Sequence, residues 1–288
     1  MSAKISILDL QQKKTDGQKI TMLTAYDYPG ATLVDEAGVD LILVGDSLAM
    51  TVLGHPNTVS VTMDEMLHHC KAVARGAKRS FLVGDMPFMS YQVSREEAIR
   101  NAGRFIKEAG MDAIKLEGGA EVVETVWAIV QAGIPVMGHL GLTPQTATKL
   151  GGFKVQGKTA AAANRLREDA LALQAAGCFA IVLEAVPAPV AESISRELEV
   201  PTIGIGAGPG CDGQVLVFHD LLGLFDRFVP KFVKQYGHLR QPMLEAFRAY
   251  KEEVEAGTFP AEAHSFRIDE AELDLFLYGD TSWEKTAS

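Results

Sequence analysis

Four acidic residues each close an otherwise apolar run of the sequence. They are Asp46, Asp85, Glu117 and Glu184, at the ends of runs such as "VDLILVGDS" and "CFAIVLEAV". A single acid at such a place is equally well explained as a helix N-cap, because a carboxylate accepts backbone N–H bonds. Four runs that end this way favour a shared site. Carboxylates gathered there repel one another, so a cation must neutralise some of them or some must be protonated.

The cation that best suits such a group is a hard divalent ion. One or two carboxylates bind Mg²⁺, and waters and substrate complete its octahedron. The candidate set contains one histidine, His139, and no cysteine. Zinc prefers nitrogen and sulfur ligands, so it fits this set less well. The pattern therefore indicates magnesium.

The other charged residues suggest substrate chemistry. Lys115 and Glu117 are two residues apart, so both point to one face of their strand. Lys115 is then an ion-pair partner of Glu117, a clamp for an anionic substrate, or both. The apolar segment "AVPAPV" follows Glu184, which suits a general base because desolvation makes a carboxylate more basic. His139 is either a satisfied core histidine or a donor to substrate or water.

Buried strands must position these side chains. The apolar runs are nearly continuous rather than alternating, which is typical of strands buried on both faces of a parallel sheet. Seven runs are clear, and an eighth at 213–220 is weaker. The clear runs are 19–27, 39–47, 80–88, 112–119, 134–141, 178–186 and 200–208.

Amphipathic segments between the runs predict helices. The segment 94–110 opens with a Ser94–Glu97 capping box and ends at a glycine, and 159–177 also ends at a glycine. A further helix is expected in "RQPMLEAFRAYKEEVEAG". Helices that end in Ala-Gly shortly before a new strand recur along the chain. This repetition predicts strand–helix units.

Eight such units predict a single-domain α/β protein, a (β/α)8 TIM barrel over residues 1–266 with an N-terminal helical segment. Residues 267–288 are expected to form a C-terminal extension, either a surface helix or a mobile tail. In a barrel the C-terminal strand ends meet at one mouth, which would gather the acids.

The main alternative fold is an open doubly wound sheet. It needs a glycine-rich turn after its first strand, and "TAYDYPGATL" does not supply one. The segment "GIGAGPG" (204–210) matches a dinucleotide-binding pattern loosely. It follows the seventh strand and no helix-opening pattern comes after it, so a tight loop around a ligand is the preferred interpretation.

Composition narrows the functional classes. The chain of 288 residues is 47% hydrophobic and has a formal net charge of -10. This balance argues against a non-specific nucleic-acid or anionic-membrane binder, but not against an anionic substrate beside a bound cation. The three cysteines show no CxxC spacing, which fits a reducing compartment. No apolar stretch approaches the roughly 18 residues of a membrane span, so a cytoplasmic protein is expected.

Nine blocks, in order from roughly residue 20 to residue 265, carry a resemblance to a known family. The blocks are "TAYD", "LVGDSL", "VLGHPNTVSVTMDEM", "GDMPF", "AIKLEGG", "VMGHLGLTPQ", "GGFKVQGKT", "IVLEAVP" and "TIGIGAGPGCDGQVLV". Together they resemble the ketopantoate hydroxymethyltransferase (3-methyl-2-oxobutanoate hydroxymethyltransferase) family. Most blocks are weak individually, and the series makes the signal specific.

The resemblance implies a (β/α)8 barrel that assembles as a homodecamer. It also implies transfer of a hydroxymethyl group from the co-substrate 5,10-methylenetetrahydrofolate to 3-methyl-2-oxobutanoate. The product would be 2-dehydropantoate (ketopantoate), formed through a Mg-stabilised enolate in pantothenate biosynthesis. One Mg²⁺ per subunit is expected.

The family's site residues carry over one by one. Asp46 and Asp85 would bind magnesium, with Glu117 at or near its coordination sphere, and Glu184 would be the base. The residues expected to contact the oxo acid are Asp46, Ser47, Asp85 and Lys115, and His139 is added as a candidate donor. Many family members end soon after the "HSF" at 264–266, so no function carries over to 267–288.

Two other functions remain open. A lyase or mutase of the phosphoenolpyruvate-mutase/isocitrate-lyase type would also use strand-end acids and magnesium to stabilise an enolate. Such enzymes usually place a reactive cysteine on a loop, and Cys70, Cys178 and Cys211 do not lie where that loop is expected. A non-enzymatic metabolite-binding barrel would bind a ligand tightly without turnover.

Overall fold

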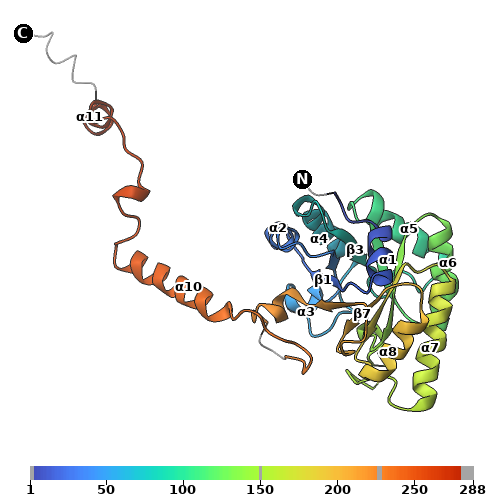
Figure 1. Ribbon diagram of the computed structural model, residues 1–288. Helices are drawn as coiled ribbons and strands as arrows, with labels where there is room; N and C mark the ends of the chain where they lie inside the picture. The colour runs from blue at the N-terminus through green and yellow to red at the C-terminus, as the bar shows by residue number, and fades with distance from the viewer. Residues whose placement is uncertain (1–2, 149–150, 226–228, 280–288) are drawn as a thin grey trace, which may run out of the picture. The chain divides into compact units, whose positions relative to one another are not determined.

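In a computed structural model the chain forms a closed barrel of eight parallel strands, so the predicted fold class is confirmed (Figure 1). The structure describes residues 3–148, 151–225 and 229–279. Each strand pairs with its neighbours in sequence, and β8 pairs with β1 to close the ring. The strands are β1 (Ile20–Thr24), β2 (Leu41–Val44), β3 (Phe81–Asp85), β4 (Ala113–Glu117), β5 (Val136–Gly141), β6 (Ala180–Glu184), β7 (Thr202–Ile205) and β8 (Gly213–Leu216).

Within residues 1–237, helices follow most of the strands and surround the barrel (Figure 1). The helices are α1 (Ile7–Thr15), α2 (Tyr28–Glu36), α3 (Leu48–Thr51), α4 (Met63–Gly76), α5 (Arg95–Lys107), α6 (Val123–Gln131), α7 (Ala160–Ala175), α8 (Ala188–Glu197), α9 (Phe218–Leu221), α10 (Arg240–Glu255) and α11 (Glu270–Tyr278). The connection from β7 to β8, all of it described, contains no helix and so departs from the predicted repeat. Gly206 and Gly208 there have φ values of 64° and 77°, which glycine adopts readily, and they form the tight loop expected of "GIGAGPG".

Local signals set the helix ends as predicted. The Ser94 side chain accepts the N–H of Glu97 at the start of α5. The reciprocal bond of a capping box is not among the described hydrogen bonds of α5, so the N-cap forms without the full box. α7 begins after Thr159, whose side chain accepts the N–H of Ala162, and ends just before Gly177.

The core has two layers. An outer layer packs the helices against the barrel, and an inner cluster fills its interior. The inner cluster contains Leu10 of α1 together with Phe81 and Phe179, whose rings meet edge to face with centroids 5.5 Å apart. Burying one leucine stabilises a fold by about 2 kcal/mol. Through this contact α1, the predicted N-terminal helical segment, packs into the N-terminal end of the barrel.

Acids at the N-terminal end of the barrel are paired. Asp40, just before β2, accepts from Lys13 Nζ at 2.7 Å and from the Thr21 N–H at 2.9 Å. Burial opposes ionisation of Asp40, but these donors outweigh it and lower its pKa. Asp212 likewise accepts from Lys14 Nζ at 2.6 Å. This end is built for stability.

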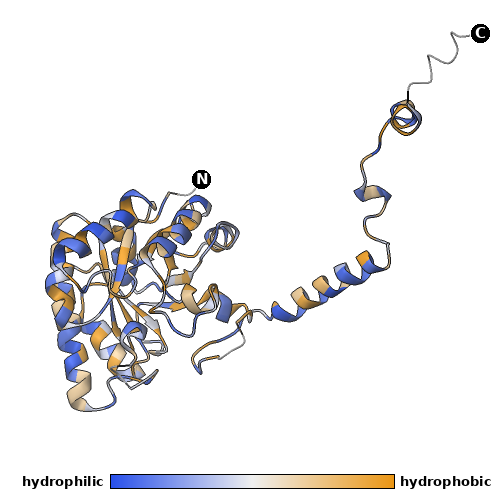
Figure 2. Cartoon of the chain, turned by 180° about the vertical axis from the view of Figure 1, so that it is seen from behind, coloured by the Kyte–Doolittle hydropathy of each residue, from blue (hydrophilic) through white to orange (hydrophobic). Residues whose placement is uncertain are grey.

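The chain divides into two compact units, Met1–Gly237 and His238–Ser288. In the second unit, α10 carries hydrophobic and hydrophilic residues side by side (Figure 2), and none of its described residues is buried. The division falls before the predicted boundary at 266, and the domain assignment stays a prediction. α11 is a helix within the predicted extension, of which residues 280–288 lie outside the described chain. No described helix is both long and apolar enough to cross a bilayer.

Candidate active site

Four consecutive strands carry charged side chains to the C-terminal end of the barrel interior. They are Asp85 on β3, Lys115 and Glu117 on β4, His139 on β5 and Glu184 on β6. Each continues the inward-facing positions that inner-cluster residues occupy earlier in the same strand. The alternation of strand side chains therefore places a charged ring directly above an apolar floor.

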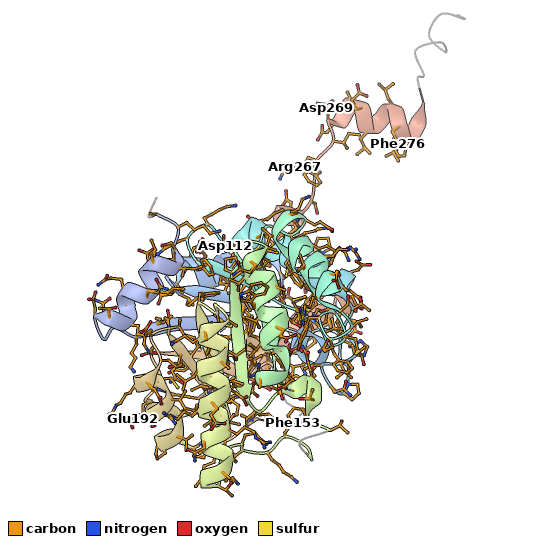
Figure 3. All side chains as sticks on the ribbon, turned by 90° about the vertical axis from the view of Figure 1, so that its right-hand side faces the viewer. Asp112, Phe153, Glu192, Arg267, Asp269 and Phe276 are labelled. Carbon is orange, nitrogen blue, oxygen red and sulfur yellow. The ribbon has the colours of Figure 1, made fainter. Side chains whose placement is uncertain are left out.

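These side chains line one cavity of about 1120 Å³. Every site residue predicted from the sequence contributes to it: Asp46, Ser47, Asp85, Lys115, Glu117, His139 and Glu184. Phe153 also lines the cavity, and Figure 3 shows it at the opposite end of the barrel from Asp112, which precedes β4. The structure thus brings all the predicted residues together at one mouth.

Asp46 and Ser47 follow β2 and belong to the same mouth. The main-chain N–H of Asp46 donates to Asp85 Oδ2 at 3.2 Å. The hydroxyl groups of Ser47 and Tyr26 lie 2.9 Å apart. In the described hydrogen bonds neither Asp46 nor Asp85 caps a helix. The N-cap explanation therefore does not account for these two acids.

Lys115 is the buried cation of the mouth. Its Nζ lies 2.9 Å from Asp85 Oδ1, and the two residues are partners in the β3–β4 ladder. Lys115 is therefore paired with Asp85 rather than with Glu117. Burial alone would lower the pKa of Lys115, but the surrounding carboxylates raise it above its ordinary value. The lysine is held in its charged form.

The carboxylates of the mouth are poorly compensated. Burial and the charges of Asp85 and Glu117 raise the pKa of Asp46 well above its ordinary value. Burial also raises the pKa of Asp85, against the opposing effect of Lys115. Both acids are almost fully buried. The site therefore holds more negative charge than its own cations balance.

His139 bridges two of the acids. Its Nδ1 lies 3.4 Å from Glu117 Oε1, and its Nε2 lies 3.2 Å from Glu184 Oε2. Burial and the Lys115 ammonium oppose protonation of the ring, but the hydrogen bonds with Glu117 and Glu184 outweigh them and raise the pKa of His139 to about 9. The His139 ring thus lies between Glu117 and Glu184, an arrangement that the sequence did not reveal.

Two buried residues that hydrogen-bond near the acids, Gln145 and Tyr91, were not predicted from the sequence. Gln145 Nε2 donates to Asp46 Oδ2 at 3.0 Å, and its main-chain N–H donates to Glu117 Oε2 at 3.0 Å. The Tyr91 hydroxyl donates to Gln145 Oε1 at 2.8 Å and accepts the Glu117 N–H at 3.1 Å. Gln145 thus orients two carboxylates at once. It ends the quoted block "VMGHLGLTPQ", which was the available signal.

The described residues contain no group of three or more His, Cys, Asp or Glu side chains arranged to hold a metal ion by themselves. Asp46, Asp85, Glu117 and Glu184 are engaged by Lys115, His139 and Gln145. Any metal at this mouth must therefore draw ligands from water or substrate as well as from the chain.

The closed barrel and the charged side chains at its C-terminal strand ends are typical of TIM-barrel enzymes, in which that end carries the active site. A family model described as "Ketopantoate hydroxymethyltransferase" matches residues 4–262. The chain belongs to the ketopantoate hydroxymethyltransferase family. The prediction of an enzyme, a hydroxymethyltransferase, is thereby confirmed.

Individual relatives agree with this family. The chain is 59% identical over 272 residues to a 3-methyl-2-oxobutanoate hydroxymethyltransferase of Syntrophomonas wolfei, covering 94% of this chain and 99% of the relative. It is 63% identical over 255 residues to the enzyme of that name from Syntrophobacter fumaroxidans, covering 88% and 90%.

Solved structures resemble the fold at low sequence identity. One is a phosphonopyruvate hydrolase in complex with oxalate and Mg++, with a TM-score of 0.59, 14% identity and 98% of each chain covered. Another is a 2,3-dimethylmalate lyase of the PEP mutase/isocitrate lyase superfamily, with a TM-score of 0.55, 16% identity and 98% of each chain covered. At this identity the likeness shows the barrel fold alone.

Proposed function

We propose that the protein transfers a hydroxymethyl group from 5,10-methylenetetrahydrofolate to 3-methyl-2-oxobutanoate and forms 2-dehydropantoate, in pantothenate biosynthesis. The observation that carries the proposal is the buried mouth in which Lys115 and four carboxylates from adjacent strands line one cavity. Family membership supports the same reaction. A 2-oxo acid brings a carboxylate and a keto oxygen, which suit a cation-containing site.

The residues of the mouth fit a magnesium ion. Their free ligands are carboxylate oxygens, which Mg²⁺ prefers, and it needs only one or two from the protein. Lys115 and His139, whose pKa values are raised, face the carboxylates of Asp46, Asp85, Glu117 and Glu184. A divalent ion has the charge that balances the remainder. Asp46 and Asp85 would hold it, with Glu117 at or near its coordination sphere.

When bound, magnesium supplies Lewis-acid stabilisation of the negative charge that develops on the keto oxygen. Lys115 would bind the oxo acid through its fixed positive charge, and Ser47 would donate a hydrogen bond that Tyr26 orients. Asp46 and Asp85 are also expected to contact this substrate. Lys115 would therefore face the carboxylate of the oxo acid, and the metal ion would face its keto oxygen.

Glu184 would remove the proton from C3. The carboxylate lies 3.2 Å from His139 Nε2 and lines the cavity, so the His139 ring would fix its position beside the substrate. His139 is a positioning residue in this proposal, and it can also donate to substrate. Water would hydrolyse the two C–N bonds of the methylene bridge, which releases tetrahydrofolate and leaves the one-carbon unit at the formaldehyde level. The carbanion at C3 would then add to that carbon, and the resulting alkoxide would take up a proton to give the hydroxymethyl group.

The cysteines give no support to the lyase or mutase alternative. Cys70, Cys178 and Cys211 are all buried, and none of them lines the cavity. Burial raises the pKa of each thiol, that of Cys178 to about 12. No thiolate is therefore available in the cavity at neutral pH.

Three broader assignments belong to the same proposal. We propose a cytoplasmic homodecamer, for which the family resemblance is the support. We also propose residues 1–266 as the catalytic domain and 267–288 as an extension without an assigned role.

Deuterium exchange tests the chemistry without the folate. Wild-type protein with 3-methyl-2-oxobutanoate and Mg²⁺ in heavy water should exchange the C3 proton, and magnesium chelation should stop the exchange. Glu184→Gln should lower the exchange rate by about 10² to 10⁴. The control is Glu192→Gln, a partly exposed glutamate on α8 that is paired with Arg196 and lies outside the cavity. Wild-type exchange in Glu184→Gln would remove that residue from the role of base.

Turnover distinguishes an enzyme from a binding barrel. Incubation with the oxo acid, 5,10-methylenetetrahydrofolate and Mg²⁺ should yield ketopantoate, detected by mass spectrometry. Tight binding of the oxo acid without product would favour the binding protein instead.

A further inference from the structure

Asp220 is a buried acid that the proposed chemistry leaves unused. It lies in the short helix α9 after β8, is only 9% exposed, and lines the cavity. No described residue forms a hydrogen bond or an ion pair with its carboxylate, and burial alone raises its pKa to about 6. A buried carboxylate without donors is costly. A ligand that supplies donors would remove that cost.

The cavity has room for such a ligand. Its volume of about 1120 Å³ exceeds the usual range for a small-molecule site, roughly 300–1,000 Å³. A five-carbon oxo acid held at Lys115 and Ser47 leaves most of this space free. Val217 and Phe225, close to Asp220 in sequence, also line it. A flat aromatic ligand suits apolar walls around one acidic group.

Two lysines add positive charge to the lining. Lys154 and Lys231 line the cavity, and both are exposed. Neither forms an ion pair with a described residue. The cavity therefore presents a buried carboxylate and solvent-accessible ammonium groups to the same space. This polarity matches a ligand with hydrogen-bond donors at one end and negative charge at the other.

We propose that Asp220 binds the pterin ring of the folate co-substrate and that Lys154 and Lys231 bind its glutamate tail. The inference rests on the proposed function, which supplies the folate. One edge of the pterin carries an N3–H and a 2-amino group side by side. A carboxylate accepts two such parallel donors, in the same bidentate geometry that it uses with arginine.

The test measures three quantities: the Kd for tetrahydrofolate by calorimetry, the KM for 5,10-methylenetetrahydrofolate, and the rate of deuterium exchange at C3. Asp220→Asn keeps the shape but replaces one acceptor with a donor, which clashes with the pterin edge. It should raise the Kd for tetrahydrofolate and the KM for 5,10-methylenetetrahydrofolate by about 10-fold to 100-fold. Deuterium exchange at C3, which needs no folate, should stay at the wild-type rate.

The proposed contact between the two lysines and the glutamate tail is tested by comparing tetrahydrofolate with a ligand that lacks the tail. The double variant Lys154→Gln/Lys231→Gln should raise the Kd for tetrahydrofolate about fivefold to tenfold but leave the Kd for tetrahydropteroate, which lacks the glutamate, unchanged. The matched control is Lys71→Gln/Lys107→Gln, two exposed lysines on α4 and α5 outside the cavity. An equal loss for both ligands would overturn the assignment of the lysines.

The outcomes separate this inference from the function on which it rests. If wild-type protein neither binds tetrahydrofolate nor uses the methylene donor, the proposed function fails and the inference fails with it. If wild-type binds and Asp220→Asn binds equally well, the inference alone is overturned. A parallel loss of folate binding, C3 exchange and thermal stability in Asp220→Asn would make Asp220 a structural residue and also overturn it.

Discussion

Asp40 and Asp46 flank the same strand, β2, and are only 2% and 5% exposed. Their surroundings nevertheless shift the pKa values of the two carboxyl groups in opposite directions. Around Asp40, Lys13 and Thr21 overcome burial and lower the pKa. Around Asp46, burial is reinforced by Asp85 and Glu117, and the pKa is raised. The N-terminal end of the barrel is satisfied by its own residues. The acids of the mouth are not balanced by their own residues, and we expect this uncompensated negative charge to favour a bound cation with an anionic substrate beside it.

Of the variants considered, Asp46→Asn should have the largest effect on activity. Loss of a proposed metal ligand and substrate contact should lower the transfer rate at saturating Mg²⁺ about a thousandfold. The metal-free protein should be as stable as wild type or more stable by about 1 kcal/mol, since one of the repelling acids is gone. Steady-state kinetics and thermal unfolding with a chelator measure the two effects. A clear loss of stability in Asp46→Asn would contradict the view that Asp46, unlike Asp40, does not stabilise the fold.

The pH dependence of stability gives the next largest effect. The pKa values of Asp46, Asp85 and His139 are raised, so the native state binds more protons than the unfolded state and stability falls as pH rises. His139 moves from 6.5 to about 9, which corresponds to about 3 kcal/mol lost as pH rises from 6.5 through 9. Asp40 has the opposite sign, because its lowered pKa stabilises the fold above about pH 4 and that stability is lost on acidification.

Denaturant titrations of the metal-free protein at pH 6 and pH 9 measure the decline. His139→Gln should flatten it, whereas His238→Gln, an exposed histidine outside the cavity, should leave it unchanged. Equal slopes in the two variants would show that the mouth histidine is not the source.

Asp40→Asn should do the reverse of Asp46→Asn. Removing the charge breaks a buried ion pair with Lys13, and we expect a loss of about 2 kcal/mol in the free energy of unfolding. The folded enzyme should keep kcat/KM within about twofold, because this acid lies at the other end of the barrel. Chemical unfolding and kinetics on the same sample provide the comparison. A large fall in kcat/KM at full stability would contradict it.

Gln145→Leu should give the smallest effect, about tenfold in kcat with little change in the KM for the oxo acid. The variant removes the donor that orients Asp46 while the Gln145 main-chain bond to Glu117 remains. Gln145→Glu should not restore activity, since it adds a further acid to the mouth. Restoration by glutamate would show that size alone matters at this position.

The acids could be predicted from the sequence because each one interrupts an apolar strand. The alternation of side chains along a strand then predicted that Lys115 and Glu117 lie on the same face. The sequence also predicted the barrel, since buried parallel strands have a recognisable pattern. It could not reveal Gln145, Tyr91 or Asp220. These residues lie in loops or short helices, where no periodicity constrains direction. Gln145 and Tyr91 reach the site only through contacts distant in sequence. The helix-free connection between β7 and β8 agrees with the sequence, in which no helix-opening pattern follows "GIGAGPG".

The packing of α1 into the N-terminal end of the barrel has a kinetic consequence. With Leu10 filling that end, ligands reach the site from the mouth. The charged residues proposed for the oxo acid are buried and Ser47 is half-buried, whereas the lysines proposed for the folate tail are exposed. Two ligands that share one entrance must enter in sequence, so the oxo acid should bind before the folate and its product should leave after tetrahydrofolate.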